Sequence, residues 1–420
     1  MRIAPTAVIL LACISLSARA ADWPAFRGPH GNGIAEEAKV PTEWDTTTNV
    51  KWKTALPEPG NGSPIVVGPR VFLTCAEDKG GLRKLICLDR ANGDQLWAGS
   101  VEFEPDWPTH KTNPHCASTP ASNGKVVVVW HASAGLYCYD MDGQQLWSRQ
   151  LGEFRHMWGE GPSPVIYQDR IILHCGPGKE VFMAAIGLNN GEVLWKTDEP
   201  ISGNGDYNEN KKYMGSWATP VLATIDGRDQ FVCTMPTRVN SYDPKTGGIV
   251  WTCDGIRGSK GDLAYSSPLI RGDFCVATGG FNGPSLGFKL GGTGNITDKN
   301  RTWRLEKNPQ SIGSGVFLGN HIFKPNADPG TIQCLDAASG EVLWTDRAGG
   351  GVYWGSIVAA AGNLYVTNQD GTTVVFKPNP DEFELVAANK LGEPSNSTPA
   401  ISDGQIFIRT HKHLYCIEHE

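Results

Sequence analysis

The sequence has few charged residues and no long apolar run. Charged residues make up 19% of the 420 residues and hydrophobic residues 40%, a combination that excludes an intrinsically disordered chain. No stretch reaches the roughly 18 consecutive apolar residues that a transmembrane helix needs. Lys and Arg number 37 against 44 Asp and Glu, and this acidic balance argues against nucleic acid as a partner.

Motifs for common catalytic chemistry are also missing. There is no Walker A phosphate-binding motif and no His-Glu-x-x-His metal motif. Residues 283–287 spell Gly-x-Ser-x-Gly, but a β-type run follows where a nucleophile elbow needs a helix. His411 and His413 share one face of an expected strand, which is typical of two surface residues. We therefore predict no catalytic and no metal-ligating residue.

Glycine and proline are abundant instead. The chain has 50 Gly and 28 Pro, shares well above the usual values of about 7% and 5%. Glycine at this density is incompatible with a coiled coil or a helical bundle. The composition predicts a turn-rich, all-β protein.

A hairpin phrase recurs along the chain, with a turn containing Gly followed by Leu-Trp or Val-Trp. In most copies an Asp-ended strand precedes the turn, which is typical of a β-hairpin. The copies are Asn92–Trp97, Asp142–Trp147, Asn190–Trp195, Gly247–Trp251 and Ser339–Trp344.

A second phrase, Ser-Pro or Thr-Pro, opens each repeat unit. The copies begin at Ser63, Thr119, Ser163, Thr219, Ser267 and Thr398, with degenerate copies at Ser314 and Ser356. Each unit then contains four short strands in about 42 to 56 residues, the pattern of one propeller blade. Eight starts predict an eight-bladed β-propeller.

The chain ends suggest how the ring closes. The eighth unit stops after residues 415–417 and lacks its outer strand, and residues 50–54 offer the missing strand. We expect this N-terminal strand to complete the last blade, which would remove an exposed sheet edge. The expected domains are a signal peptide at 1–20, an extension at 21–44 that wraps the outside or covers one face, and the propeller at 45–420.

Residues 1–20 have the features of a secretory signal. Arg2 precedes an apolar segment, and Ala18-Arg19-Ala20 forms an A-x-A cleavage site. We expect cleavage after Ala20 and a periplasmic or secreted protein. Lipid anchoring at Cys13 is not favoured, because cleavage there would leave a very short apolar segment.

Ten cysteines remain after this cleavage. Cys87, Cys138, Cys334 and Cys416 occupy one repeated strand slot, which favours small buried apolar residues over disulfide halves. Cys75 and Cys87 fall on neighbouring expected strands, and a disulfide between them stays open.

The Gly-x-x-Leu-Trp hairpins, the Cys-Leu-Asp strands and the eightfold count resemble the PQQ-like β-propeller repeats. That family includes BamB-like scaffold proteins and quinoprotein alcohol dehydrogenases. The opening Trp23–Gly33 is similar to the start of exported bacterial members of the non-dehydrogenase branch.

For a dehydrogenase, the resemblance implies a vicinal disulfide, a Trp beneath the quinone and a Ca²⁺ ion held by Glu, Asn and Asp. This sequence has no two adjacent cysteines, so none of those catalytic residues is carried over. We expect no cofactor. PQQ with Ca²⁺ belongs to the alternative function.

Polar and aromatic residues gather in the loops before the innermost strands, which meet at one mouth of the channel. The candidate binding residues are Lys111, His115, Trp158, Glu160, Tyr213, Trp217 and Trp354. Convergent aromatics with a few polar groups are typical of a binding site; the alternative is that these residues only plug the channel.

These features favour a monomeric, exported, non-catalytic scaffold, BamB-like, that binds an envelope protein or polymer partner. A PQQ-dependent quinoprotein oxidoreductase without the vicinal disulfide is the alternative. Whether the chain is an enzyme stays open, with binding favoured over catalysis.

Overall fold

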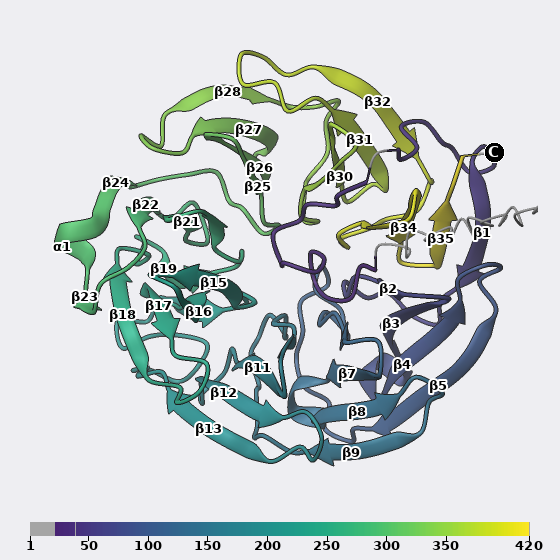
Figure 1. Cartoon of the computed structure of the whole chain (residues 1–420), viewed down its shortest axis with the longest axis horizontal. Helices are drawn as coiled ribbons and strands as arrows, with labels where there is room; N and C mark the ends of the chain where they lie inside the picture. Colours follow the sequence, from purple (N-terminus) through teal and green to yellow (C-terminus); the bar gives the residue numbers. More distant parts are fainter. Residues whose placement is uncertain (1–21, 38, 420) are drawn as a thin grey trace, which may run out of the picture.

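The computed structural model describes residues 22–37 and 39–419, which form eight antiparallel sheets arranged as a ring (Figure 1). The expected signal peptide, including Cys13, lies outside the described residues. No helix in the described part of the chain is long and apolar enough to cross a membrane. The architecture is the predicted eight-bladed, all-β propeller.

Each blade has four strands, which follow one another from the channel outward. Blade 1 holds β2 (Ile65–Val67), β3 (Arg70–Glu77), β4 (Leu82–Asp89) and β5 (Gln95–Glu102). Blade 2 holds β6 (Ala121–Ser122), β7 (Val126–Trp130), β8 (Leu136–Asp140) and β9 (Gln145–Arg149). Blade 3 holds β10 (Val165–Tyr167), β11 (Arg170–Cys175), β12 (Phe182–Gly187) and β13 (Val193–Asp198). Blade 4 holds β15 (Val221–Ile225), β16 (Arg228–Thr234), β17 (Arg238–Tyr242) and β18 (Ile249–Asp254).

The second half of the ring repeats this order. Blade 5 holds β20 (Leu269–Arg271), β21 (Phe274–Thr278), β22 (Ser285–Lys289) and β24 (Arg301–Leu305). Blade 6 holds β25 (Val316–Leu318), β26 (His321–Ala327), β27 (Gly330–Asp336) and β28 (Val342–Asp346). Blade 7 holds β29 (Val358–Ala360), β30 (Asn363–Thr367), β31 (Thr372–Phe376) and β32 (Leu385–Lys390). Blade 8 holds β33 (Ala400–Ser402), β34 (Gln405–Arg409), β35 (His413–Ile417) and β1 (Val50–Ala55).

Blade 8 confirms the predicted closure. Strand β1 is its outermost strand and pairs antiparallel with β35, from Val50 opposite Ile417 to Ala55 opposite His413. The two ends of the chain therefore share one sheet, and the ring has no gap between its first and last units.

The Ser/Thr-Pro phrases join neighbouring blades around the channel. The backbone N–H of Ser63 donates to the Thr119 hydroxyl at 2.9 Å, and the N–H of Thr119 donates to the Ser163 hydroxyl at 3.0 Å. The pattern continues through every blade until the N–H of Thr398 donates to the Ser63 hydroxyl at 3.0 Å. Ser314 and Ser356 take part without a following Pro, because the hydroxyl is the group that forms the contact.

A second set of contacts joins the blades at the rim. The Trp97 indole N–H donates to the backbone carbonyl of Met141 in the next blade at 3.0 Å. The same contact is made by Trp52, Trp147, Trp195, Trp303 and Trp344. These hydrogen bonds give the outer-strand Trp a role at six of the blade junctions, whereas the buried Trp251 of blade 4 makes no such bond in the described part of the chain.

Small residues lie opposite these tryptophans within each sheet. Cys87 is paired with Trp97, Cys138 with Trp147, Cys334 with Trp344 and Cys416 with Trp52. All ten described cysteines are free and buried, so Cys75 and Cys87 are not joined. The repeated cysteines are small apolar packing residues, as predicted.

The N-terminal segment 22–37 covers one face and crosses the channel. Trp23 exchanges two backbone hydrogen bonds with Val66 of blade 1, and Gly33 accepts one from Ala359 of blade 7. Between them the buried Arg27 guanidinium donates to the Gly315 carbonyl of blade 6. Figure 1 shows this segment near the centre of the ring. The segment crosses this end of the channel, and hollows remain between it and the inner strands of blades 4 and 5.

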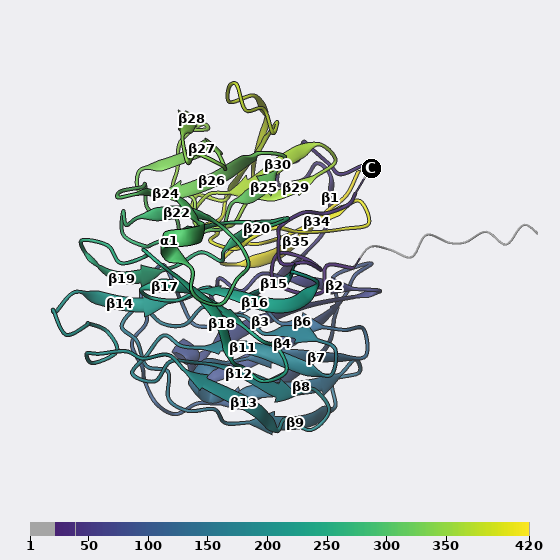
Figure 2. The same cartoon turned by 60° about the vertical axis from the view of Figure 1, so that its left-hand side comes forward.

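Two features lie outside the regular blades. The loops before blades 4 and 5 form a parallel pair, β14 (Tyr213–Ser216) with β19 (Gly261–Ala264), on the side of the disc away from the N-terminal segment (Figure 2). Strand β23 (Gly294–Asn295), followed by helix α1 (Thr297–Asn300), adds a fifth, parallel strand to the edge of β18.

The rim contacts generate a prediction about the hairpin glycines. Gly191 has φ of +68° and a Cβ added there would lie 2.5 Å from the Trp147 ring, whereas Gly362 has φ of +72° and open space around it. The Gly362→Ala control should lose about 1 kcal/mol of stability from backbone strain alone. Gly191→Ala should lose at least about 2 kcal/mol, because the Trp147 ring must also move. Denaturant midpoints measure both, and equal losses would contradict a role for the Trp contact.

A buried lysine weakens the interior of blade 6. Lys324 is 5% exposed, its Nζ has no hydrogen-bond partner in the described part of the chain, and it pairs across the sheet with Gln333. Burial lowers the pKa of Lys324 from 10.5 to about 7. Between pH 7 and pH 10.5 the Lys324 amine is therefore protonated in the unfolded chain and neutral in the folded chain. The free energy of unfolding rises with pH over that range.

We expect Lys324→Met to stabilise the protein by at least about 2 kcal/mol at pH 6, because the apolar side chain needs no partner. The gain should shrink as the pH rises from 7 toward 10.5, where the wild-type amine is neutral in both states. Urea unfolding at several pH values measures the difference between the two proteins. A gain that does not change with pH would show that Lys324 is not the titrating group.

Candidate binding pocket at the channel mouth

One pocket of about 260 Å³ occupies the mouth of the channel away from the N-terminal segment. Its inner lining is the ring of hydroxyl groups from the Ser/Thr-Pro phrases, together with Phe26 of the N-terminal segment. Because that segment crosses the channel, the pocket has a floor. The pocket opens on the side of the loops that precede the inner strands.

Aromatic residues form one wall, contributed by blades 3, 4 and 5. Trp158 lies at its centre, with ring centroids 5.8 Å from Trp217, 5.5 Å from Phe281 and 6.4 Å from Tyr265. Tyr213 packs behind Trp158 at 4.8 Å. Since each ring is held by two or more others, this wall is preorganised.

Amide side chains dominate the other side, from blades 1, 2 and 8. Asn113 Nδ2 donates to the carbonyls of Trp158 and Glu160 at 2.8 and 2.7 Å. Asn61 Nδ2 donates to Asn113 Oδ1 at 3.1 Å, and the Asn396 amide donates to the Thr112 carbonyl at 2.9 Å. Trp354 precedes blade 7, which is opposite blade 3 in an eight-membered ring, and so faces the aromatic wall across the channel.

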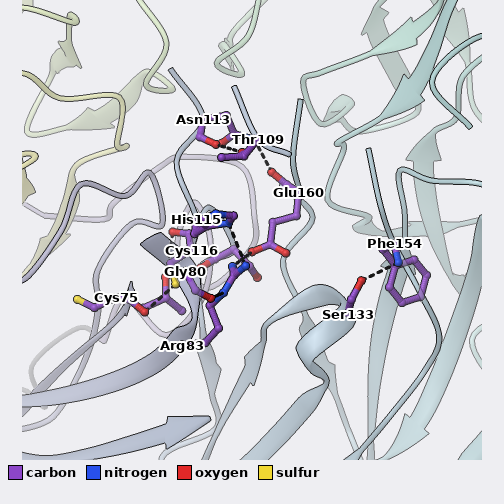
Figure 3. Close-up of polar contacts among 12 residues, drawn as sticks. Cys75, Gly80, Arg83, Thr109, Asn113, His115, Cys116, Ser133, Phe154 and Glu160 are labelled. Atoms are coloured by element: carbon purple, nitrogen blue, oxygen red, sulfur yellow. Dashed lines mark hydrogen bonds and ion pairs between the residues drawn. The ribbon is translucent and has the colours of Figure 1, made fainter. Parts of the chain in front are cut away.

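A buried charged cluster supports the loops beneath this mouth (Figure 3). The Arg83 guanidinium donates to the Gly80 carbonyl at 2.7 Å, contacts His115 Nδ1 at 2.9 Å and pairs with Glu160 Oε1 at 3.3 Å. Arg83 is buried. The His115 ring packs so closely on Gly80 that a Cβ there would lie 2.3 Å from it.

Burial sets the protonation states in this cluster. Burial, together with the nearby Arg83 charge, lowers the pKa of His115 to about 4. Burial also raises the pKa of Glu160, an effect that the Arg83 charge and the Cys116 N–H partly offset. At neutral pH His115 is uncharged and accepts a hydrogen bond from Arg83. The cluster fixes loop positions and presents no free catalytic base.

The structure gathers most of the sequence-predicted residues at this mouth. Trp158, Glu160, Trp217 and Trp354 line the pocket, and Tyr213 supports the aromatic wall from behind. His115 lies beneath it in the Arg83 cluster. Lys111 is different: it is exposed at a loop tip and is not part of the lining.

Other lining residues were not among the candidates. Asn61 and Asn396 each stand two positions before the Ser or Thr of a repeat phrase. That shared position in the repeat could have identified them as lining residues. Phe281 comes from the turn between β21 and β22, and Phe26 comes from the segment that crosses the channel. Neither has a recognisable sequence signal.

The fold and pocket define an eight-bladed β-propeller whose channel is crossed at one end by the N-terminal segment. The chain matches the family model described as outer membrane protein assembly factor BamB, over residues 83–346 and 328–417. The match covers more than half of the sequence, so the chain belongs to this family of PQQ-like repeat propellers. No curated protein sequence matches the chain.

Solved structures of both branches share the fold. BamB from Moraxella catarrhalis superposes with a TM-score of 0.59 at 15% identity, covering 90% of this chain and 99% of that chain. The quinohemoprotein alcohol dehydrogenase from Comamonas testosteroni gives 0.67 at 11% identity, covering 96% and 81%. A europium-containing methanol dehydrogenase gives 0.54 at 10% identity, covering 95% and 98%.

The residues of the pocket do not fit PQQ with Ca²⁺. PQQ carries three carboxylates, yet the described lining includes no Lys or Arg, and its one carboxylate, Glu160, is paired with Arg83. Carboxylates supply charge at Ca²⁺ sites, and the one carboxylate of the lining is already paired with Arg83. No group of three or more His, Cys, Asp or Glu that could hold a metal lies in the described residues.

The Arg83–Glu160 pair generates a prediction. Arg83→Met leaves the Glu160 carboxylate buried without a cation, and we expect a loss of about 3 kcal/mol in the free energy of unfolding at pH 7. Adding Glu160→Gln removes the uncompensated charge and should recover most of that loss. Denaturant unfolding of the wild type, the two single variants and the double variant completes a double-mutant cycle for this pair. A double variant no more stable than Arg83→Met would show that Arg83 acts through packing or His115 instead.

Proposed function

We propose that this chain is an exported, non-catalytic scaffold of the bacterial envelope that binds a protein or polymer partner at the channel mouth. The family description, an outer membrane protein assembly factor, supports an envelope role, and the signal-like N-terminus supports export. A scaffold needs only a surface of fixed shape. The closed ring of blades provides such a surface within a single chain.

The observation that carries this proposal is the chemistry of the pocket. Its walls are aromatic and amide, its floor is hydroxyl and Phe26, and its single carboxylate is held in an ion pair. A redox site of the quinoprotein type would need cations for the quinone carboxylates and oxygen ligands for a metal. A binding site needs only the preorganised contacts that these side chains make.

A calorimetric titration with PQQ, with and without Ca²⁺, tests the proposal. We expect no saturable heat in either titration, because the lining has no cation for the PQQ carboxylates. Saturable binding that requires Ca²⁺, followed by dye-linked alcohol oxidation, would refute the scaffold function. The titration should use protein whose unfolding transition shows that it is fully folded.

The mouth itself can be tested by photo-cross-linking in the envelope of a producing bacterium. A cross-linking residue at Trp354, in the pocket lining, should give a discrete adduct. The same residue at His30, which is exposed in the N-terminal segment at the other end of the channel, is the control and should not give that adduct. An identical adduct from both positions would place the contact elsewhere than the mouth.

A further inference from the structure

The pocket has neutral polar groups that the fold does not use. Trp158, Trp354, Tyr265 and Gln310 line the pocket, and each carries a neutral polar group: an indole N–H, a hydroxyl or an amide. Within the part of the chain that the structure describes, none of these groups takes part in a hydrogen bond. Donors and acceptors left open beside aromatic rings are positions where a ligand can be held.

The floor offers further donors. Each hydroxyl of the Ser/Thr ring accepts a backbone N–H from the neighbouring blade, and this contact leaves its own O–H free to donate. An apolar side chain entering the pocket would cover these hydroxyls without pairing them, which costs free energy. A ligand rich in hydroxyl groups would pair them.

The pocket excludes a charged ligand by the same reasoning. Glu160 is the only acidic side chain in the described lining, which has no Lys or Arg, and Arg83 already balances it. A free carboxylate or phosphate would lose its hydration and gain no cation in return. The ligand that fits is therefore neutral, has apolar faces to lie on Trp158 and Trp217, and has polar groups around its edge.

We infer that the pocket binds the end of a neutral oligosaccharide. A pyranose ring presents C–H groups on its faces and hydroxyls at its edge, which matches the aromatic wall and the amide and hydroxyl surroundings. The volume of about 260 Å³ lies just below the range of about 300 to 1,000 Å³ for larger ligands, so one or two rings fill it. Because the N-terminal segment crosses the channel and Phe26 forms part of the floor, we expect a chain end to enter the pocket rather than a chain to thread through it. This inference rests on the proposed scaffold function and specifies its polymer.

Tryptophan fluorescence and calorimetric titration with neutral oligosaccharides of two to six units test the inference. The probes are linear β-1,4-glucose, α-1,4-glucose, β-1,4-mannose and β-1,4-N-acetylglucosamine series. At least one series should bind saturably, with an affinity that does not increase beyond two units, since only the terminal rings enter. No binding of any series up to about 10 mM, a negligible affinity, would overturn the inference, as would an affinity that keeps rising with chain length.

Two variants connect binding to the pocket. Trp354→Ala and Gln310→Ala each remove a lining side chain with no side-chain hydrogen bond to the rest of the described chain, and each should weaken binding roughly tenfold or more. Trp107→Ala is the matched control, since Trp107 is half-buried against Phe103 and lies outside the pocket lining. Unchanged binding in both pocket variants would overturn the inference.

The comparator ligands separate the glycan inference from the scaffold function. Adenosine and N-acetyltryptophanamide are neutral aromatic ligands. If either of them binds and no sugar does, the pocket is a binding site but its ligand is not a sugar, and the inference is overturned. If neither the sugars nor PQQ bind, this inference is rejected and the scaffold function remains. Ca²⁺-dependent PQQ binding would reject the scaffold function itself.

Discussion

The whole propeller depends on one repeated hydrogen bond, from a backbone N–H at the start of one blade to a Ser or Thr hydroxyl at the start of the next. Eight of these bonds form a closed circle, from Ser63 through Thr398 and back to Ser63. A circle of contacts sets the angle between every pair of blades at once, because no blade can rotate without stretching two bonds. The rim tryptophans then hold the outer strands at the same angle.

The same circle produces the pocket. Hydroxyls that hold the blades together also form the inner lining, and the loops that lead into those hydroxyls carry Trp158, Trp217 and Trp354. The binding surface is thus as rigid as the joints between blades. The Ser/Thr-Pro phrase thus has two effects. It joins neighbouring blades, and it places the eight loops that precede it around one opening.

The repeat made most of the fold predictable from the sequence. The hydroxyl and the outer Trp are local features with a fixed spacing, so the eight blades and the closing strand at residues 50–54 could be counted from the residues alone. The loop position also identified Trp158, Glu160, Trp217 and Trp354. Phe26 and Arg83 could not be found in this way, because their positions depend on how one segment crosses the channel and on how one hairpin folds over its neighbour.

Strand β1 is the first blade strand along the chain, and its partner β35 is the last. A chain that appears from its N-terminus must keep this strand unpaired while seven blades form. The segment that carries Phe26 can pair with Val66 as soon as blade 1 forms, but its contacts with Gly315 and Ala359 need blades 6 and 7. Bringing together residues this far apart has a large loop-closure cost and is slow. The pocket is therefore complete only when the last blades have formed, because its lining includes Trp354, Asn396 and Thr398 from the loops before blades 7 and 8.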